Sequence, residues 1–339
     1  MLVGSSCFES LDMKSYCEAS SRVGVCEITG KECEVVDFDD FDEFFSELFL
    51  AFECSDKGEP LYLIIHNNWT IFSDSVIAKT LLNDVAVRNG FKKGSEEKVV
   101  YSERVFEYVP SWKMLKERVC FFSRFFAHQS SEDQELWSEC FQPNVVVPAE
   151  TIFYRGRLNQ SEVSTFTDPE DLKAPPAKFA SSGRANSHGI PVLYLSTDKN
   201  TLMYETRALY GDKLSIGEFH TVKELALVDF NYVPDLYREY SRSGADTLLK
   251  AMRFHFLMQA ISKDMSKPMR RYDVKELEYV PTQYVCEFIR ENSDADGIMF
   301  SSSLHVGGIN VVLFDVAAAV CHSVEVAVVG QLHMKYEEV

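Results

Sequence analysis

One stretch, Ser181–Arg207, contains side chains whose types and spacing suit a shared chemical task. Arg184 lies in a loop, Tyr194 lies in a short apolar strand, and Glu205 follows about two turns into the next helix. Because these elements are consecutive, a guanidinium, an aromatic ring and a carboxylate can converge on one cleft. A guanidinium pairs with phosphate, and a carboxylate stabilises a developing positive charge. The stretch therefore favours a phosphate-bearing ligand with a planar ring.

Short strands and helices must position these groups in the second half of the chain. The apolar strand ends at Leu195, and the helix begins near Asp198. This mixture predicts an α+β domain rather than a doubly wound sheet. Further helices are expected at Asp246–Lys263 and Pro281–Glu291, and further strands at Gly217–His220, Ala226–Phe230, Gly297–Phe300 and Asn310–Phe314.

The length of 339 residues favours two domains. Gln142–Pro148 is the best linker candidate, because its two prolines suppress helix and separate the first half of the chain from the second. We therefore expect a mainly helical accessory or regulatory domain over residues 1–145 and the site-bearing domain over residues 146–339.

An aromatic helix is the clearest feature of the first domain. Its apolar residues recur at helical spacing, and acidic residues fill the positions between them. We interpret the acidic residues as a solvated face on a packed helix. The apolar positions are Phe41, Phe44, Phe45, Leu48 and Phe52.

The charge and the hydropathy exclude several classes of partner. The formal net charge is −18 and the pI is about 4.9. Nucleic acids and anionic membranes need a basic surface, so neither is expected as a partner. The sequence shows no signal peptide and no apolar run long enough to span a bilayer. The expected location is the cytoplasm, and the sequence leaves the oligomeric state open.

Nine cysteines are present, an odd number that is typical of reduced thiols rather than of a disulfide framework. Cys7, Cys26 and Cys33 lie close enough in sequence to raise a weak possibility of zinc. Paired Cys-x2-Cys knuckles, which grip a tetrahedral ion, are absent. We therefore expect no metal.

Several fragments of the second half occur in an order that resembles the RES domain, a family named for its Arg, Glu and Ser. The resemblance extends over roughly residues 150–315. The first domain resembles, more loosely, the module that precedes some RES and HEPN domains, although that module's paired cysteines are only partly present. The fragments are Phe153–Arg155, Pro175–Pro176, Gly183–Asn186, Gly189–Leu195, Thr201–Arg207, Tyr279–Tyr284, Asp296–Ser303 and Gly307–Phe314.

The resemblance implies a fold related to ADP-ribosyltransferases and NAD⁺ as the substrate. It implies that Arg155, Glu205 and Ser302 are the catalytic Arg, Glu and Ser. Three consecutive serines leave Ser303 as an alternative to Ser302. Residues implied to line the NAD⁺ cleft are Arg184, Tyr194, Asn186 and Ser303.

The chemistry of these residue types agrees with that substrate. Cleavage of the nicotinamide–ribose bond passes through an oxocarbenium-like transition state, which an adjacent carboxylate such as Glu205 stabilises. The same carboxylate can orient or deprotonate water. Arg155 and Arg184 suit the pyrophosphate, and Tyr194 can stack on nicotinamide. Arg207 is interpreted as a structural partner of a carboxylate.

Three functions remain open at this point. The first is an NAD⁺ glycohydrolase or phosphorylase that acts as a growth-arresting toxin. The second is an ADP-ribosyltransferase that modifies a protein. The third is an inactive module that senses a nucleotide or a protein. The resemblance also implies a helical antitoxin protein as a partner.

Overall fold

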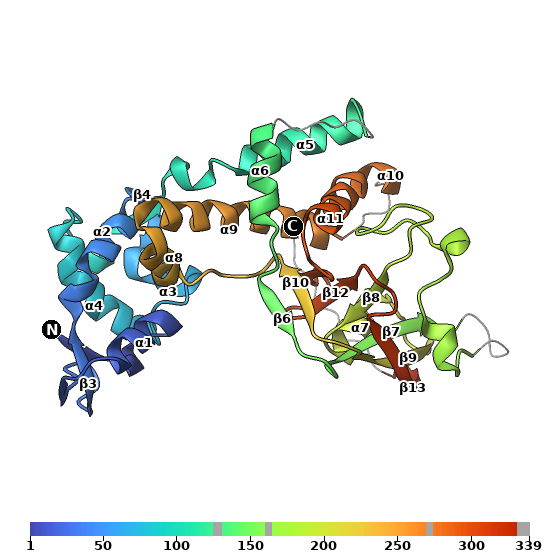
Figure 1. Ribbon diagram of the computed structural model, residues 1–339, viewed down its shortest axis with the longest axis horizontal. Helices are drawn as coiled ribbons and strands as arrows, with labels where there is room; N and C mark the ends of the chain where they lie inside the picture. Colours follow the sequence, from blue (N-terminus) through green and yellow to red (C-terminus); the bar gives the residue numbers. More distant parts are fainter. Residues whose placement is uncertain (125–130, 160–164, 269–273, 331–339) are drawn as a thin grey trace. The chain divides into compact units, whose positions relative to one another are not determined.

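The structure, a computed structural model, describes residues 1–124, 131–159, 165–268 and 274–330 (Figure 1). The chain forms two compact units. Unit 1 consists of Met1–Pro110 and Val233–Leu257, and unit 2 consists of Ser111–Tyr232 and Met258–Val339. The combination of helices and strands confirms the predicted α+β class.

This division differs from the single boundary after residue 145 that the prolines suggested. Residues 111–145 group with unit 2, and Val233–Leu257 groups with unit 1. The physical reason is packing, because Leu236, Leu248 and Met252 belong to the same hydrophobic cluster as the aromatic residues near the N-terminus. Such contacts between segments distant in sequence leave no local signal in either segment.

Unit 1 combines helices with two small antiparallel sheets. One sheet has the order β1-β3-β2, and the other pairs β4 with β5. Its elements are β1 (Leu2–Gly4), α1 (Leu11–Glu18), β2 (Val23–Val25), β3 (Glu32–Asp37), α2 (Asp42–Phe49), β4 (Phe52–Pro60), α3 (Leu61–Asn68), α4 (Ser75–Arg88), β5 (Lys98–Tyr101), α8 (Leu236–Ser243) and the first part of α9 (Ala245–Ser266).

The core of unit 1 is aromatic, as the helical spacing predicted. Phe41, Phe44 and Phe45 are at most 1% exposed, and Leu48 and Phe52 are also buried. The helix itself is shorter than the apolar pattern, because α2 ends at Phe49 and Phe52 begins β4.

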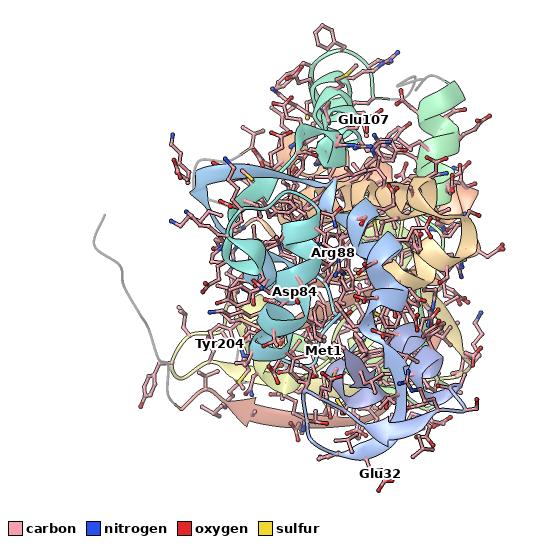
Figure 2. The ribbon with its side chains drawn as sticks, turned by 90° about the vertical axis from the view of Figure 1, so that its left-hand side faces the viewer. Met1, Glu32, Asp84, Arg88, Glu107 and Tyr204 are labelled. Atoms are coloured by element: carbon pink, nitrogen blue, oxygen red, sulfur yellow. The ribbon has the colours of Figure 1, made fainter. Side chains whose placement is uncertain are left out.

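Charged side chains of unit 1 lie on its outside. Glu32, Asp84 and Arg88 are exposed, and Figure 2 labels them. The Arg88 guanidinium binds both carboxylate oxygens of Asp42, at 2.6 and 2.7 Å. These contacts agree with a solvated acidic face over a packed helix.

Unit 2 contains an eight-stranded mixed sheet with the order β13-β9-β7-β8-β12-β11-β10-β6. The pair β10 and β11 is parallel, and the other neighbours are antiparallel. The strands are β6 (Val145–Val147), β7 (Ile152–Leu158), β8 (Leu193–Ser196), β9 (Lys213–Thr221), β10 (Leu225–Asp229), β11 (Gly297–Ser301), β12 (Ile309–Leu313) and β13 (Ala319–Val328).

The helices expected in the second half of the chain are present in the structure. The helix expected from Asp246 is α9, and the one expected from Pro281 is α11, with proline in its first turn. The predicted strands at residues 217–220, 226–230, 297–300 and 310–314 coincide largely with β9, β10, β11 and β12. The helices are α5 (Val109–Phe121), α6 (Ser131–Cys140), α7 (Lys199–Glu205), the last part of α9, α10 (Lys275–Glu278) and α11 (Val280–Asn292).

The sheet has a continuous apolar core on which the site is built. Phe153, Leu193, Leu195, Val311 and Leu313 are all buried. Their alternation along β7, β8 and β12 leaves the intervening side chains for the opposite face. Among the described helices, none has the length and apolar character needed to cross a membrane.

Candidate active site

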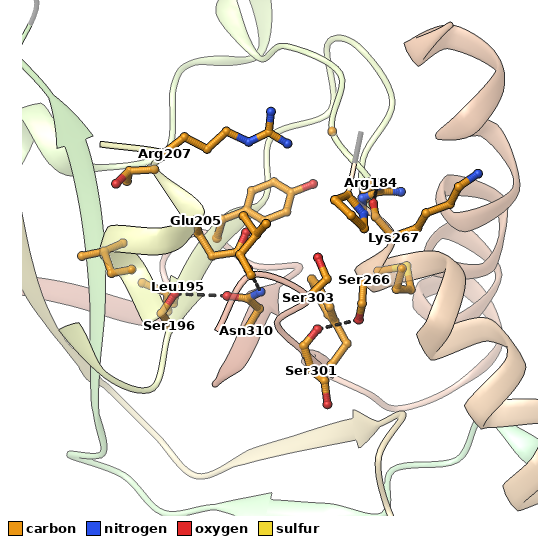
Figure 3. Close-up of a pocket in the computed structure, with 18 of the residues that line it drawn as sticks. Arg184, Leu195, Ser196, Glu205, Arg207, Ser266, Lys267, Ser301, Ser303 and Asn310 are labelled. Carbon is orange, nitrogen blue, oxygen red and sulfur yellow. Dashed lines mark hydrogen bonds between the residues drawn. The ribbon is translucent and has the colours of Figure 1, made fainter. Parts of the chain in front are cut away.

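Unit 2 contains a cavity of about 540 Å³ over β7, β8 and β12 (Figure 3). Its volume lies within the range of small-molecule sites. The lining combines cationic, hydroxyl and aromatic side chains. The polar, charged and aromatic lining residues include Arg155, Arg184, Tyr194, Ser196, Glu205, Arg207, Lys267, Tyr279, Ser301, Ser303 and Asn310.

Glu205 reaches this cavity because α7 begins at a strong cap. The carboxylate of Asp198 accepts a hydrogen bond from the backbone N–H of Thr201, at 2.9 Å, and another from its hydroxyl. Burial alone raises the pKa of Asp198, but the bonds from Thr201 outweigh it and hold that pKa below its usual value. Leu202 then packs against Gly156 of β7, where an added Cβ would lie 3.0 Å away. The cap and this packing bring Glu205, at the end of α7, over the sheet.

Two donors bind one oxygen of Glu205. The Ser302 hydroxyl donates to Oε1 at 2.7 Å, and Asn310 Nδ2 donates to the same oxygen at 2.7 Å. Ser302 is itself fixed, because its Oγ accepts the backbone N–H groups of Leu304 and His305, each at 3.1 Å. The structure therefore brings Glu205 and Ser302 together, as the sequence predicted.

The neighbouring serines have different surroundings. Ser301 Oγ donates to Asn231 at 2.7 Å, and the Ser301 carbonyl accepts from Ser266, a bond drawn in Figure 3. Ser303 is exposed and lines the cavity. Of the three serines, Ser302 is the one in contact with Glu205.

Arg155 extends from β7 into the cavity wall, and part of its guanidinium lacks a hydrogen-bond partner. Its Nη1 is buried and has no hydrogen-bond partner. Burial, and to a lesser extent the charge of Arg157, lower the pKa of Arg155 to about 10. A buried guanidinium without an acceptor is costly, and an anionic ligand would remove that cost.

Arg184 lines the same cavity, but both of its terminal nitrogens donate a hydrogen bond within the protein. Its guanidinium donates to the backbone carbonyls of Asp264, at 3.1 Å, and of Lys267, and it lies 5.0 Å from the centre of the Tyr279 ring. Burial lowers its pKa. The two arginines therefore differ, because Arg184 is held at the end of α9 whereas Arg155 retains an unused donor.

Tyr194 and Asn186 hold the loop that carries Arg184. The Tyr194 hydroxyl donates to Asn186 Oδ1 at 2.8 Å and accepts the Ala185 N–H at 3.0 Å. Burial raises the pKa of Tyr194. A Cβ on Gly183 would lie 2.4 Å from that hydroxyl, so the loop needs glycine there. Tyr194 lines the cavity with its ring.

Asn186 is positioned differently from the predicted ligand contact. It is buried, and its Nδ2 donates to the carbonyls of Ser181, Ser187 and Ile190. Its side-chain amide is therefore used within the loop, and the residue is not part of the cavity lining. The motif correctly located the loop, but the side chain supports that loop from inside.

Asn310 and Arg207 are among the cavity residues that were not selected from the sequence as ligand contacts. Asn310 is a polar residue within the apolar run of β12, which is the signal that would have identified it. Arg207 was interpreted as a partner of a carboxylate, but it lines the cavity and forms no ion pair among the described residues. Its backbone φ is +52°, in the left-handed region that non-glycine residues adopt uncommonly.

The cavity carries more positive than negative charge, although the whole chain is acidic. Three arginines and Lys267 line it together with Glu205. Lys267 Nζ is paired with Glu278 at 2.8 Å. An anionic ligand would find a local positive potential here.

A metal centre has no support in the part of the chain that the structure describes. Cys7 Sγ and Cys26 Sγ lie 3.6 Å apart in unit 1. No group of three or more His, Cys, Asp or Glu within residues 1–124, 131–159, 165–268 and 274–330 is arranged to hold an ion. The three cysteines considered for zinc are therefore free thiols in the structure.

A comparison with models of protein families matches residues 150–337 to the RES domain. Neither the curated proteins nor the solved structures contain a significant match. The matched range includes every lining residue of the cavity. It is consistent with an NAD⁺-related, toxin-like function.

Proposed function

Since the chain belongs to the RES domain family, we propose that its cavity binds NAD⁺ and cleaves the nicotinamide–ribose bond. The observation that carries this proposal is that Arg155 and Glu205 line one cavity and that Ser302 binds the Glu205 carboxylate. A cation for the pyrophosphate and a carboxylate for the reacting sugar are the two charges that this reaction requires.

The carboxylate of Glu205 suits the reacting end of the substrate. As the bond between ribose and nicotinamide breaks, its electron pair moves to the ring nitrogen and positive charge develops on the sugar. Glu205 stabilises this charge because the attraction strengthens as the bond breaks. Water then attacks the sugar carbon, and Glu205 accepts the proton that is released.

The proposed role of Arg155 is to bind the pyrophosphate. Its buried Nη1 lacks an acceptor, which phosphate oxygens would supply as charge-assisted bonds. Arg184 contributes mainly charge, because Nη1 and Nη2 each already donate to a carbonyl, those of Asp264 and Lys267. Tyr194 presents its ring to nicotinamide, and Ser303 is available for polar contact at the cavity wall.

One assay tests the reaction and identifies the nucleophile. Purified wild-type protein and Glu205→Gln protein are incubated with NAD⁺, with and without inorganic phosphate, and nicotinamide release is measured. We expect the variant to be slower by about 1000-fold, since it keeps the shape of the side chain and loses the charge. ADP-ribose as the product indicates hydrolysis, and a phosphorylated ADP-ribose indicates phosphorolysis. Wild-type protein that leaves NAD⁺ intact would contradict the proposal and favour a sensor module.

Transfer of ADP-ribose to a protein is the second candidate. The side chain of Glu205 is exposed, so a macromolecular acceptor can approach the reacting sugar. Incubation with NAD⁺ labelled in its adenosine part and with cell lysate separates the two reactions. Transfer leaves the label on protein, whereas hydrolysis leaves it in small molecules.

We also propose the biological setting that the sequence suggested. A growth-arresting toxin would act in the cytoplasm, and its nine free cysteines suit a reducing compartment. A helical antitoxin would inhibit it by covering the cavity, and the N-terminal unit would serve as an accessory or regulatory part. Co-purification from cells that express the Glu205→Gln protein tests for such a partner.

A further inference from the structure

Glu205 is bound asymmetrically by the protein. Ser302 and Asn310 both donate to Oε1, each at 2.7 Å. Within the described part of the chain, no hydrogen bond reaches Oε2. One oxygen is therefore fixed by the protein, and the other remains for a ligand.

The two donors lie in different surroundings. Ser302 lies on the turn between β11 and β12, where its Oγ accepts the N–H groups of Leu304 and His305. Asn310 is 8% exposed on β12, directly opposite Ser196 of β8 in the sheet register. Ser196, itself 3% exposed, donates its hydroxyl to Asn310 Oδ1 at 3.1 Å. Both strands belong to the rigid centre of the sheet.

The contact with Glu205 determines the direction of the Asn310 amide. A carboxylate only accepts hydrogen bonds, so the Nδ2 end of the amide must face Glu205. The amide Oδ1 then faces Ser196, whose hydroxyl donates to it and holds the side chain in place. The order Ser196, Asn310, Glu205 is visible as two consecutive dashed lines in Figure 3.

We propose that Asn310, oriented by Ser196, is a positioning residue that presents Glu205 Oε2 to the reacting sugar. The proposal rests on the proposed function and assigns a role to two residues outside the Arg, Glu and Ser set. An amide suits this role because it neither gains nor loses a proton over the working pH range, so the donor is always present. Orientation before the reaction lowers the barrier, because no reorganisation is needed in the transition state.

The main test replaces the donor with an acceptor of nearly the same shape. In Asn310→Asp, kcat falls about 100-fold while KM stays within about threefold, since a contact to the reacting carboxylate acts mainly in the transition state. The acidic limb of the kcat/KM profile moves to higher pH, because two adjacent carboxylates resist simultaneous ionisation. A merely structural role would lower the amount of folded protein without moving that limb.

A milder variant keeps the test valid if Asn310→Asp does not fold. Ser196→Ala removes the anchor of the amide and leaves Asn310 in place, and we expect kcat to fall about fivefold at constant KM. Ser215→Ala is the matched control, because Ser215 is a fully buried serine of the same sheet whose hydroxyl bonds Asn159. Equal kcat values for the two alanine variants would overturn the proposal.

A measurement without turnover separates this proposal from the proposed function. With ¹³C-labelled glutamate, the titration of the Glu205 carboxyl carbon moves to higher pH in Asn310→Asp than in wild type. If wild-type protein does not cleave NAD⁺, the proposed function fails, but this titration still tests the contact. Titration at the same pH in both proteins would show that Asn310 does not act on Glu205.

Discussion

The aromatic core of unit 1 and the cavity of unit 2 differ in whether their buried groups have partners within the protein. In the core, Phe41, Phe44 and Phe45 are at most 1% exposed and contact one another or nearby rings. In the cavity, Arg155 Nη1 is buried without a partner. A closed apolar core stabilises the fold, whereas an unsatisfied buried polar group costs stability unless a ligand supplies its partner.

The same difference separates the two arginines of the cavity. Arg184 uses its donors on the carbonyls of Asp264 and Lys267 and is thereby part of the scaffold. Arg155 has an unused donor and is thereby ready for a ligand. Two residues of one type, both found from sequence fragments, therefore have different tasks in one cavity.

The largest expected change in stability comes from removing a ring of the aromatic core. Phe45→Ala should lower the free energy of unfolding by about 3–5 kcal/mol, because a fully buried ring is replaced by a cavity. Urea denaturation followed by tryptophan fluorescence measures it. Activity per folded molecule should stay unchanged at low temperature. Phe122→Ala is the control, because that ring is 84% exposed and should cost little.

A smaller effect is expected at Arg155, where a substitution should weaken NAD⁺ binding without lowering stability. Arg155→Met should raise the KM for NAD⁺ about 10- to 100-fold, as expected for the loss of a charge-assisted bond. It should also keep or raise the melting temperature, since an uncompensated buried charge is removed. Arg157→Met, on the same strand but outside the cavity lining, should leave KM unchanged. A large loss of stability in Arg155→Met would show that the guanidinium serves the scaffold.

The smallest effect is expected at the cap of α7. Asp198→Ala should cost about 1 kcal/mol of stability. It should also lower kcat, because the helix that carries Glu205 begins there. Asp74→Ala removes the equivalent cap of α4 and should cost similar stability with no change in kcat.

The pH dependence of the cap follows from the pKa of Asp198. That pKa is lowered in the folded protein, so the carboxylate stabilises the fold above the unfolded value of 3.8. This contribution is lost as the pH falls through the folded pKa. The difference in stability between wild type and Asp198→Ala should therefore shrink in acid, and a difference that grows there would contradict the assignment.

Much of the fold was predictable where the spacing of apolar residues along one element indicates which side chains are buried. The spacing of Phe41, Phe44, Phe45 and Leu48 identified a buried face, although it did not show that β4 begins at Phe52. The apolar run of β12 was predicted as a strand, but the polar Asn310 within it was not recognised as part of the site. Local patterns describe one element at a time, and the partner across the sheet is not visible in them.

The sequence by itself determined which elements form, and its ordered fragments located the loop, strand and helix that carry Arg184, Tyr194 and Glu205. Tertiary structure decided which of these side chains face the cavity. It used the amide of Asn186 inside the loop, bound Arg184 to the end of α9, and brought Asn310 within 2.7 Å of a glutamate 105 positions earlier in the chain. The physical reason is that hydrogen-bond partners far apart in the sequence meet only when the chain is packed, so the sequence does not show which donors will find an acceptor.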